Sequence, residues 1–80
     1  MKNGFEGFTS KQLRQVGQNI YLARFAAGLT QVELAKRIGF TQQHLGSCET
    51  GYYRPGLRLV FAVAYELGVP VAELFREEAS

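Results

Sequence analysis

Features typical of exported proteins and of many enzymes are scarce in this chain. Its 80 residues include one cysteine and one histidine, and tryptophan is absent. A single cysteine cannot form an internal disulfide, so we expect a reducing, cytoplasmic environment. One histidine and one cysteine, without clustered ligands or a Walker-type phosphate loop, assemble neither a metal site nor a catalytic site. The sequence therefore predicts no metal, no cofactor and no enzymatic activity.

Long apolar runs and alternating patterns are also missing. No segment approaches the ~20 apolar residues of a membrane helix, and the N-terminus lacks the apolar core of a signal peptide. No stretch alternates with period two, so we expect no sheet. A 46% apolar fraction in 80 residues instead indicates one small helical domain. We place it at residues 10–77, between an N-terminal arm (1–9) and a short C-terminal tail (78–80).

The central segment, residues 30–49, has the pattern of two short helices joined by a tight turn. Thr30 and Thr41 each precede a helical pattern as N-caps, and Glu33 completes a capping box with Thr30. Gly39 can end the first helix because glycine tolerates positive φ. Two helices of about two turns joined in this way predict a helix-turn-helix unit.

Three more helices are expected around this unit. Thr9 or Ser10 can cap one that ends near Ala27, and the others are predicted at about residues 57–67 and 71–76. Helical spacing of apolar residues defines the expected core. Its members are Leu13, Val16, Ile20, Ala23, Ala27, Leu34, Ala35, Ile38, Leu45, Cys48, Leu57, Val60, Val63, Ala64, Leu67, Leu74 and Phe75.

Charge is distributed unevenly, although the net charge is only +2. Residues 11–58 contain seven basic and two acidic side chains, whereas residues 65–80 contain one basic and four acidic ones. A solvated face of mixed charge would also explain this difference. Together with a helix-turn-helix unit, however, it favours a basic side that faces DNA.

The whole pattern resembles the Cro/C1-type (XRE) helix-turn-helix family, which includes lambdoid phage repressors and small restriction–modification controller proteins. The resemblance extends from Val16 to Phe75 and depends on matching positions in all five elements. Those positions are Ile20, Arg24, Gly28, Leu29, Thr30, Gln31, Leu34, Ala35, Ile38, Gly39, Leu45, Glu49, Gly51, Pro55, Ala64, Leu67, Gly68, Val69 and Leu74. The resemblance implies an all-α, compact five-helix lambda-repressor-like domain, with the helix-turn-helix at about residues 31–49. It also implies a sequence-specific transcriptional regulator that binds a palindromic operator in the major groove as a homodimer.

The expected DNA-reading residues are at the start of the second helix of the unit. Gln42 and Gln43 occupy its first turn, and an amide can contact adenine N6 and N7 together. The resemblance adds Ser47, one turn further along, as a third base-reading residue. Gly46 departs from the polar residue usual in the family. Solvated glutamines without a DNA role are the alternative interpretation of this pattern.

Phosphate contacts are expected from groups on either side of these residues. Gln31 begins the first helix of the unit, where its amide and the helix N-terminus can meet one phosphate. His44, Tyr53, Arg54 and Arg58 are the other candidates, although a histidine in solvent or a tyrosine that only packs would fit the same pattern. The resemblance further implies a structural ion pair between Arg24 and Glu49.

Two apolar surfaces exceed what one small core can bury. Near Tyr21, Leu22 and Phe25, either the aromatic segment containing Phe5 and Phe8 folds back, or a protein partner covers the patch. The resemblance places a dimer interface at the second surface, which consists of Phe61, Tyr65, Val69 and Val71. The alternative function is a protein-interaction module of the same fold, such as an antitoxin or a partner-binding subunit.

Overall fold

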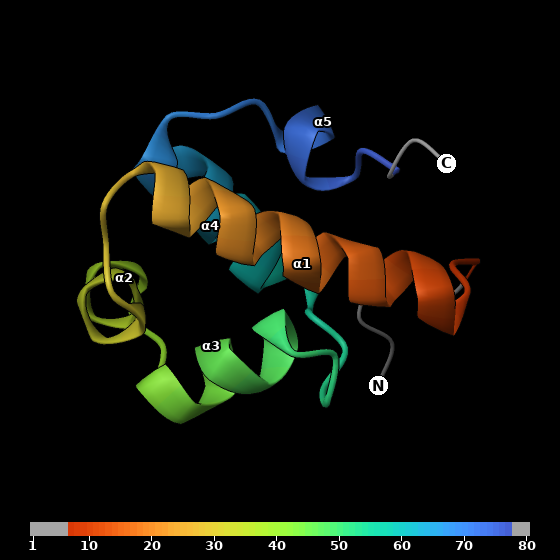
Figure 1. Ribbon diagram of the computed structural model, residues 1–80, viewed down its shortest axis with the longest axis horizontal. Coiled ribbons are helices and arrows are strands. Elements are labelled where there is room, and N and C mark those ends of the chain that lie inside the picture. Colours follow the sequence, from red (N-terminus) through yellow and green to blue (C-terminus); the bar gives the residue numbers. More distant parts are fainter. Residues whose placement is uncertain (1–6, 78–80) are drawn as a thin grey trace.

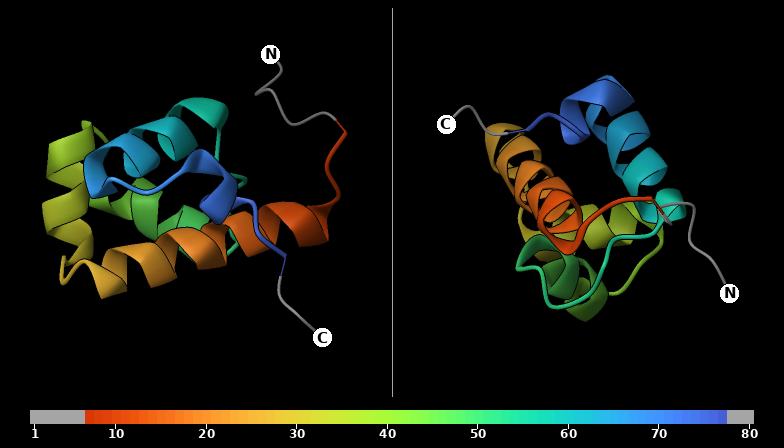
Figure 2. Two further views of the ribbon diagram at one scale, coloured as in Figure 1. Left: turned by 90° about the horizontal axis from the view of Figure 1, so that it is seen from above. Right: turned by 90° about the vertical axis from the view of Figure 1, so that its right-hand side faces the viewer.

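The long first helix organises the molecule, as the computed structural model shows for residues 7–77, the part of the chain that the structure describes. This part contains no strand, and its helices are α1 (Ser10–Ala26), α2 (Gln31–Ile38), α3 (Gln42–Glu49), α4 (Leu57–Leu67) and α5 (Val71–Leu74). α1 contacts α3, α4 and α5, and α2 packs between α3 and α4. α3 and α5 therefore lie on opposite sides of α1 (Figure 1; Figure 2). The predicted all-α, five-helix fold is confirmed.

The helix boundaries follow from short-range hydrogen bonds. Thr9, Thr30 and Thr41 are N-caps whose hydroxyl oxygens accept from the backbone N–H three residues later, at 3.0–3.1 Å. Glu33 completes the predicted capping box, since its carboxylate accepts from the Thr30 N–H at 2.9 Å. These bonds from Thr30 lower the pKa of Glu33. Gly39 ends α2 with a φ of +77°, a value that favours glycine.

α5 is shorter than the sequence predicts: it ends at Leu74 rather than near Arg76. Asn19, which is buried in α1, binds the chain where α5 ends. Its side-chain amide donates to the carbonyl oxygens of Leu74 at 3.1 Å and Arg76 at 2.7 Å. Its own oxygen accepts from Gln15 at 3.0 Å. The segment after α5 is thus held to α1 by hydrogen bonds outside any helix.

The core contains most of the expected apolar residues, with two corrections. Leu57 is 39% exposed and Leu59 is buried in its place. Leu57 begins α4 and is about 200° around the helix from Leu59, which shares the inner face with Val60 and Val63. Ala27 is exposed because α1 ends before it. The buried apolar residues are Leu13, Val16, Ile20, Leu34, Ala35, Leu45, Cys48, Leu59, Val60, Val63, Ala64 and Leu74.

The N-terminal aromatic segment is described in part. Phe8 packs edge-to-face against Phe75, with the ring centroids 5.8 Å apart. Phe5, like the rest of residues 1–6 and the tail 78–80, lies outside the described residues. Between residues 7 and 77, no helix is long and apolar enough to cross a membrane.

Candidate nucleic-acid interface

The three expected base-reading residues line one open hollow on α3. Gln42 and Gln43 are exposed in the first turn, and Ser47 is half-buried one turn later. The hollow has a volume of about 590 Å³. It is lined by Gln31, Gln42, Gln43, Gly46, Ser47, Thr50 and Tyr52. Side chains from α2, α3 and the following loop therefore face one space that a ligand can enter.

Gln31 links this hollow to the protein interior. Its Nε2 donates to Glu49 Oε1 at 2.9 Å, and its Oε1 accepts from Gln42 Nε2 at 2.7 Å. These two bonds restrict Gln42 to one position at the start of α3. The Gln31 amide retains one N–H and one lone pair for a phosphate or a water, and its phosphate contact stays a prediction.

Gly46, which departs from the family pattern, makes room for Gln31. A Cβ atom at Gly46 would lie 3.1 Å from Gln31 Oε1 and 3.3 Å from Nε2. The glycine costs helix propensity of about 1 kcal/mol relative to alanine. In exchange, the Gln31 side chain can lie across α3 and reach Gln42.

Arg24 and Glu49 form a buried, bidentate ion pair between α1 and the end of α3. Arg24 Nε donates to Glu49 Oε2 at 2.7 Å, and its Nη2 donates to Oε1 at 3.0 Å. The two side chains are 10% and 2% exposed. Arg24 Nη1 also donates to the carbonyl oxygen of Leu29 at 2.8 Å. The hydrogen bond with Glu49 raises the pKa of Arg24, and the pair fixes the end of α3 against α1.

The arginines predicted to bind phosphate lie on the surface. Arg58 places its guanidinium carbon 5.6 Å from the ring centroid of Phe40. Arg54 Nη2 donates to the hydroxyl of Ser10 at 3.4 Å. Within residues 7–77, neither arginine forms an ion pair. Both positive charges are therefore available to an anion.

His44 lies in an aromatic stack rather than at an open position. Its ring is parallel to Phe40, with centroids 5.6 Å apart, and its centroid is 6.2 Å from that of Tyr53. Its Nε2 is 3.9 Å from the sulfur of Cys48. The stack joins the turn before α3 to the loop after it. Tyr53 also packs edge-to-face on Tyr52, and the predicted phosphate contacts of His44 and Tyr53 stay predictions.

Two residues that position the interface were not predicted from the sequence. A Cβ atom at Gly17 would overlap the carbonyl oxygen of Cys48, so only glycine allows α3 to approach α1 this closely. Asn19 is the second missed residue. Both positions are on the inner stripe of α1, next to Val16 and Ile20. A glycine and an amide within an otherwise apolar stripe were the available signals.

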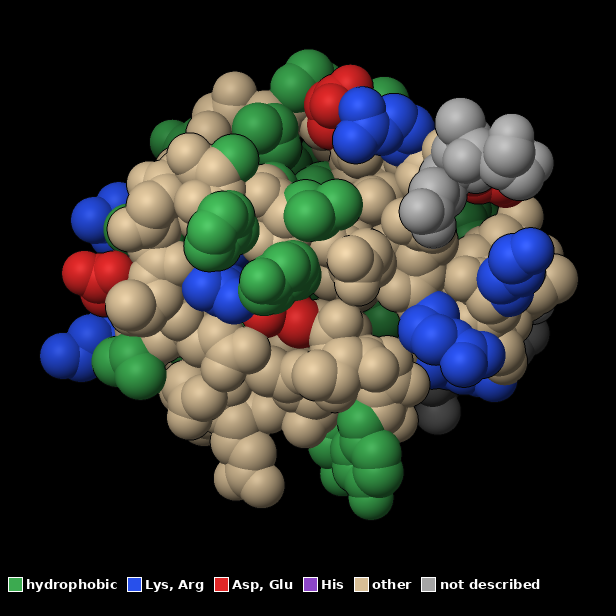
Figure 3. Space-filling view, in the orientation of Figure 1, with side chains coloured by type: hydrophobic (Ala, Val, Ile, Leu, Met, Phe, Trp, Pro, Cys, Tyr) green, Lys and Arg blue, Asp and Glu red, His purple; other side chains and the backbone are tan. Residues whose placement is uncertain are grey.

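Two apolar surfaces remain exposed, as the sequence predicts. Phe61 and Tyr65 are 50% and 89% exposed on α4, and Leu57 extends the same stripe at the i, i+4, i+8 spacing. Val69 and Val71, which the sequence assigned to the same surface, are half-buried and pack against the core, and Val69 lines a hollow with Leu22 and Ala23 of α1. Tyr21, Leu22 and Phe25 are exposed on α1, where hydrophobic side chains gather on the visible face (Figure 3).

Residues 7–77 contain no group of three or more His, Cys, Asp or Glu side chains that could hold a metal ion. Cys48 is free and buried. Burial raises the pKa of its thiol to about 11. The thiol therefore stays protonated near neutral pH and packs as a small apolar group.

Comparison with known proteins agrees with this geometry. A helix-turn-helix family model matches residues 20–74. An uncharacterized HTH-type transcriptional regulator of Sinorhizobium fredii is 42% identical over 59 residues, which are 74% of this chain and 77% of that protein. The immunity repressor protein of Bacillus phage phi105 is 38% identical over 63 residues, which cover 79% of this chain and 44% of the repressor. The restriction–modification controller protein C.AhdI from Aeromonas hydrophila has a TM-score of 0.75 and 31% identity, over 81% of this chain and 98% of that chain.

The family assignment agrees with the fold and with the exposed start of α3. The matched region begins in α1 and ends with α5, and so includes the complete helix-turn-helix unit. Members of the family regulate transcription and are not enzymes. The chain belongs to the Cro/C1-type (XRE) helix-turn-helix family of DNA-binding transcriptional regulators.

Proposed function

We propose that this protein is a sequence-specific transcriptional regulator that binds a palindromic operator as a homodimer, with α3 of each subunit in the major groove. The observation that carries this proposal is the exposure of Gln42 and Gln43 in the first turn of α3, in one hollow with Ser47. The N-terminal residues of the recognition helix contact base edges in this docking mode.

The two glutamines have different roles in this proposal. Within residues 7–77, the side chain of Gln43 forms no hydrogen bond, so both its amide N–H donors and its side-chain oxygen are available for a bidentate contact with adenine. Gln42 donates to Gln31. It therefore reaches a base with one N–H already used and with its orientation fixed.

Phosphate contacts from Gln31, Arg54 and Arg58 fix the orientation of α3 on the duplex. Such contacts supply affinity without reading sequence. Arg54 is in the loop after α3, and Arg58 is in the first turn of α4. His44 and Tyr53 contribute by holding this loop against α3 and by offering polar ring atoms at the edge of the stack.

The homodimer forms through the α4 stripe and the segment after it. One recognition helix covers only a few base pairs, whereas a twofold dimer doubles the sequence that is read. Tyr65 is almost fully exposed in the isolated chain, Phe61 is exposed one turn before it on α4, and the half-buried Val69 and Val71 follow in the next segment. Two copies that bury this surface would place their recognition helices about 34 Å apart, one turn of duplex.

A second candidate function is a protein-interaction module, such as an antitoxin, in which a partner covers the α1 patch. The favouring observation is the exposure of Leu22 and Phe25 beside Tyr21, whose ring stacks on Phe25 with centroids 6.1 Å apart. This patch is on α1, and Leu22 lines one hollow together with Val69 of the segment after α4.

Selection of bound sites from random duplex DNA, using the purified protein, tests the main proposal against the second. Enrichment of a palindrome whose half-sites are about one helical turn apart is the expected result. Recovery of duplexes without a common sequence would overturn the proposal and favour the interaction module. A Gln42→Ala/Gln43→Ala variant is the control, because it keeps the fold and loses the proposed readers.

A further inference from the structure

A second group of cations lies beside the hollow of the reading residues. It consists of Lys11 and Arg14 in the N-terminal half of α1 and Arg54 in the loop after α3, and we name it the flanking cluster. Lys11 and Arg14 are three residues apart and therefore neighbours on the surface of one helix. Arg54 joins them through its 3.4 Å hydrogen bond to Ser10.

Arg14 is held in place by the loop that follows α3. A Cβ atom at Gly51 would lie 2.5 Å from Arg14 Cγ and 3.1 Å from Cδ, so the aliphatic stem of Arg14 packs directly on the glycine. Gly51 has a φ of +85°, which turns the chain at this point. The stem is thus packed while the residue remains exposed, which leaves its guanidinium in solvent.

The flanking cluster is not neutralised within residues 7–77. None of its three cations takes part in an ion pair there. Glu49, the carboxylate nearest in the hollow, is occupied by Arg24. Glu77 accepts from Gln12 at 3.5 Å, but the Gln12 side chain leaves α1 about 100° away from that of Lys11. Among the described residues, a positive patch without a counter-charge therefore remains.

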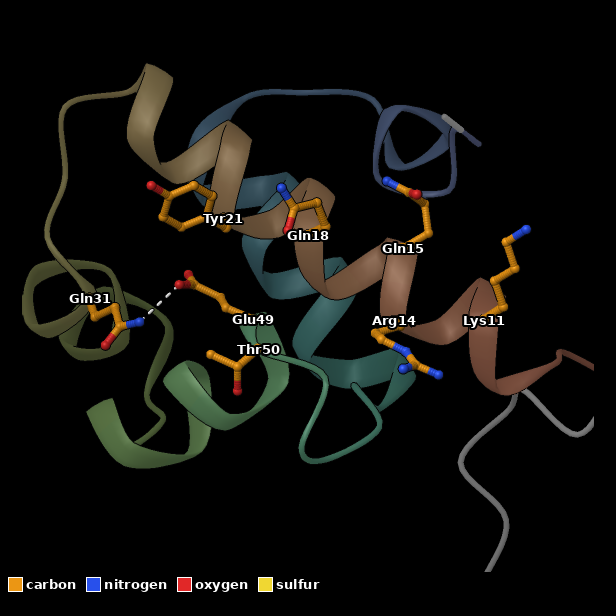
Figure 4. Close-up of a pocket in the computed structure, with 8 residues that line it drawn as sticks. All are labelled: Lys11, Arg14, Gln15, Gln18, Tyr21, Gln31, Glu49 and Thr50. Atoms are coloured by element: carbon orange, nitrogen blue, oxygen red, sulfur yellow. Dashed lines mark hydrogen bonds between the residues drawn. The ribbon is translucent and has the colours of Figure 1, made fainter. Parts of the chain in front are cut away.

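The patch adjoins the surface proposed to read DNA. Lys11 and Arg14 line one end of a hollow of about 650 Å³, and Gln31, Glu49 and Thr50 line its other end (Figure 4). Gln31 and Thr50 also line the hollow of the reading residues. The two hollows are therefore adjacent, with Gln31 and Thr50 between them, and the flanking cluster lies beside the surface on which a duplex would sit against α3.

We propose that Lys11 and Arg14 bind backbone phosphates outside the bases read by α3, and so extend the contact of each subunit beyond Arg54. This inference rests on the proposed function. Duplex DNA carries one charge per ~1.7 Å of its axis, and each neutralised phosphate releases condensed counterions. The contact adds affinity for any sequence and lengthens the protected duplex, but it does not change base preference.

The test compares Lys11→Gln and Arg14→Gln with Arg76→Gln, which removes one charge at the acidic end next to α5. Affinity is measured against the selected duplex and a scrambled duplex over a series of salt concentrations. Each flanking variant should weaken binding to both duplexes by the same factor. It should also reduce the log–log salt slope by about 0.9 for each phosphate that a subunit no longer neutralises. Hydroxyl-radical footprints should shorten at their outer ends, while Arg76→Gln should retain the wild-type slope and footprint.

Failure of the proposed function and failure of the Lys11 and Arg14 phosphate contacts give different results. If the wild-type protein selects no duplex, the proposed function is wrong. If the wild-type selects a site and both flanking variants keep its salt slope and footprint, the flanking cluster is not part of the interface and only this inference is overturned. Because Lys11 and Arg14 are exposed, their variants should keep the wild-type melting temperature, which circular dichroism verifies.

Discussion

Gly17 of α1 and Cys48 of α3 lie in direct backbone contact. The Cα of Gly17 faces the Cys48 carbonyl oxygen so closely that a Cβ atom would overlap it. Glu49 is the next residue of α3, and its carboxylate accepts a hydrogen bond from Arg24 in the buried ion pair. Arg24 lies about two turns after Gly17 in α1. Close approach and ion pair together determine the angle at which α3 leaves the body of the protein.

Gly17→Ala should destabilise the fold by roughly 1–3 kcal/mol or more. Helix propensity alone predicts the opposite sign, since alanine is favoured by about 1 kcal/mol, but the clash is with backbone and no rotamer relieves it. Urea unfolding measures the change. Gly7→Ala is the matched control, because no atom lies within 4 Å of its added Cβ, and a Gly17 variant as stable as this control would contradict the close contact.

Arg24→Ala should cost roughly 3–5 kcal/mol of unfolding free energy, because it leaves the Glu49 carboxylate buried without its cation. Adding Glu49→Gln should restore part of this loss, since a neutral amide is less costly to bury. The control is Arg76→Ala, which breaks an exposed pair and should cost no more than about 1 kcal/mol. A decrease below about 1 kcal/mol for Arg24→Ala would show that the pair does not support the fold.

Gln43→Ala should reduce discrimination at one base position by about 1–3 kcal/mol. Gln31→Ala should reduce discrimination at a different position, because Gln42 loses the bond that orients it. Titrations against the preferred duplex and its single-base variants measure both effects. Gln18→Ala, an exposed glutamine of α1, should leave discrimination unchanged. Wild-type discrimination in the Gln43 variant at every position would remove this residue from the reading set.

Tyr65→Glu should convert the proposed homodimer to folded monomers with much weaker operator binding. The side chain is 89% exposed in the single chain, so the substitution places a charge in the proposed interface without disturbing the core. Sedimentation at micromolar concentration reports the change. Phe25→Glu is the control on the other apolar surface and should remain dimeric; the reverse result would move the interface to α1.

The buried Cys48 thiol should make the free energy of unfolding decrease at alkaline pH. Burial raises the pKa of its thiol from 9.0 to about 11, so the folded chain holds this proton more tightly than the unfolded chain. The contribution is complete below about pH 9 and is lost as pH rises through 11, with a limit of about 2–3 kcal/mol. Unfolding measured at about pH 8, 10 and 11 should show the decline, and Cys48→Ala should lack it. Parallel profiles for the two proteins would exclude the thiol as its cause.

The sequence was sufficient for the helices and for their order. Thr30, Thr41 and Gly39 act through neighbours within four residues, so their capping roles are visible in the linear pattern. The family's spacing also indicated which residues of α3 would be exposed. The capping roles are properties of short range, and they do not depend on how the helices pack.

Packing decided the rest. Periodicity placed Leu57 in the core, but the structure buries Leu59, because the rotation of α4 is set by contacts with α1, α2 and α5. Asn19 binds the last carbonyl oxygen of α5 from 55 residues away. Gln31 contacts Glu49 and Gln42, which the sequence did not predict, while its expected phosphate contact stays a prediction. Each of these contacts joins segments that are far apart in the chain and come together only in the tertiary structure. Local propensities carry no information about such distances, so the sequence alone could not predict these contacts.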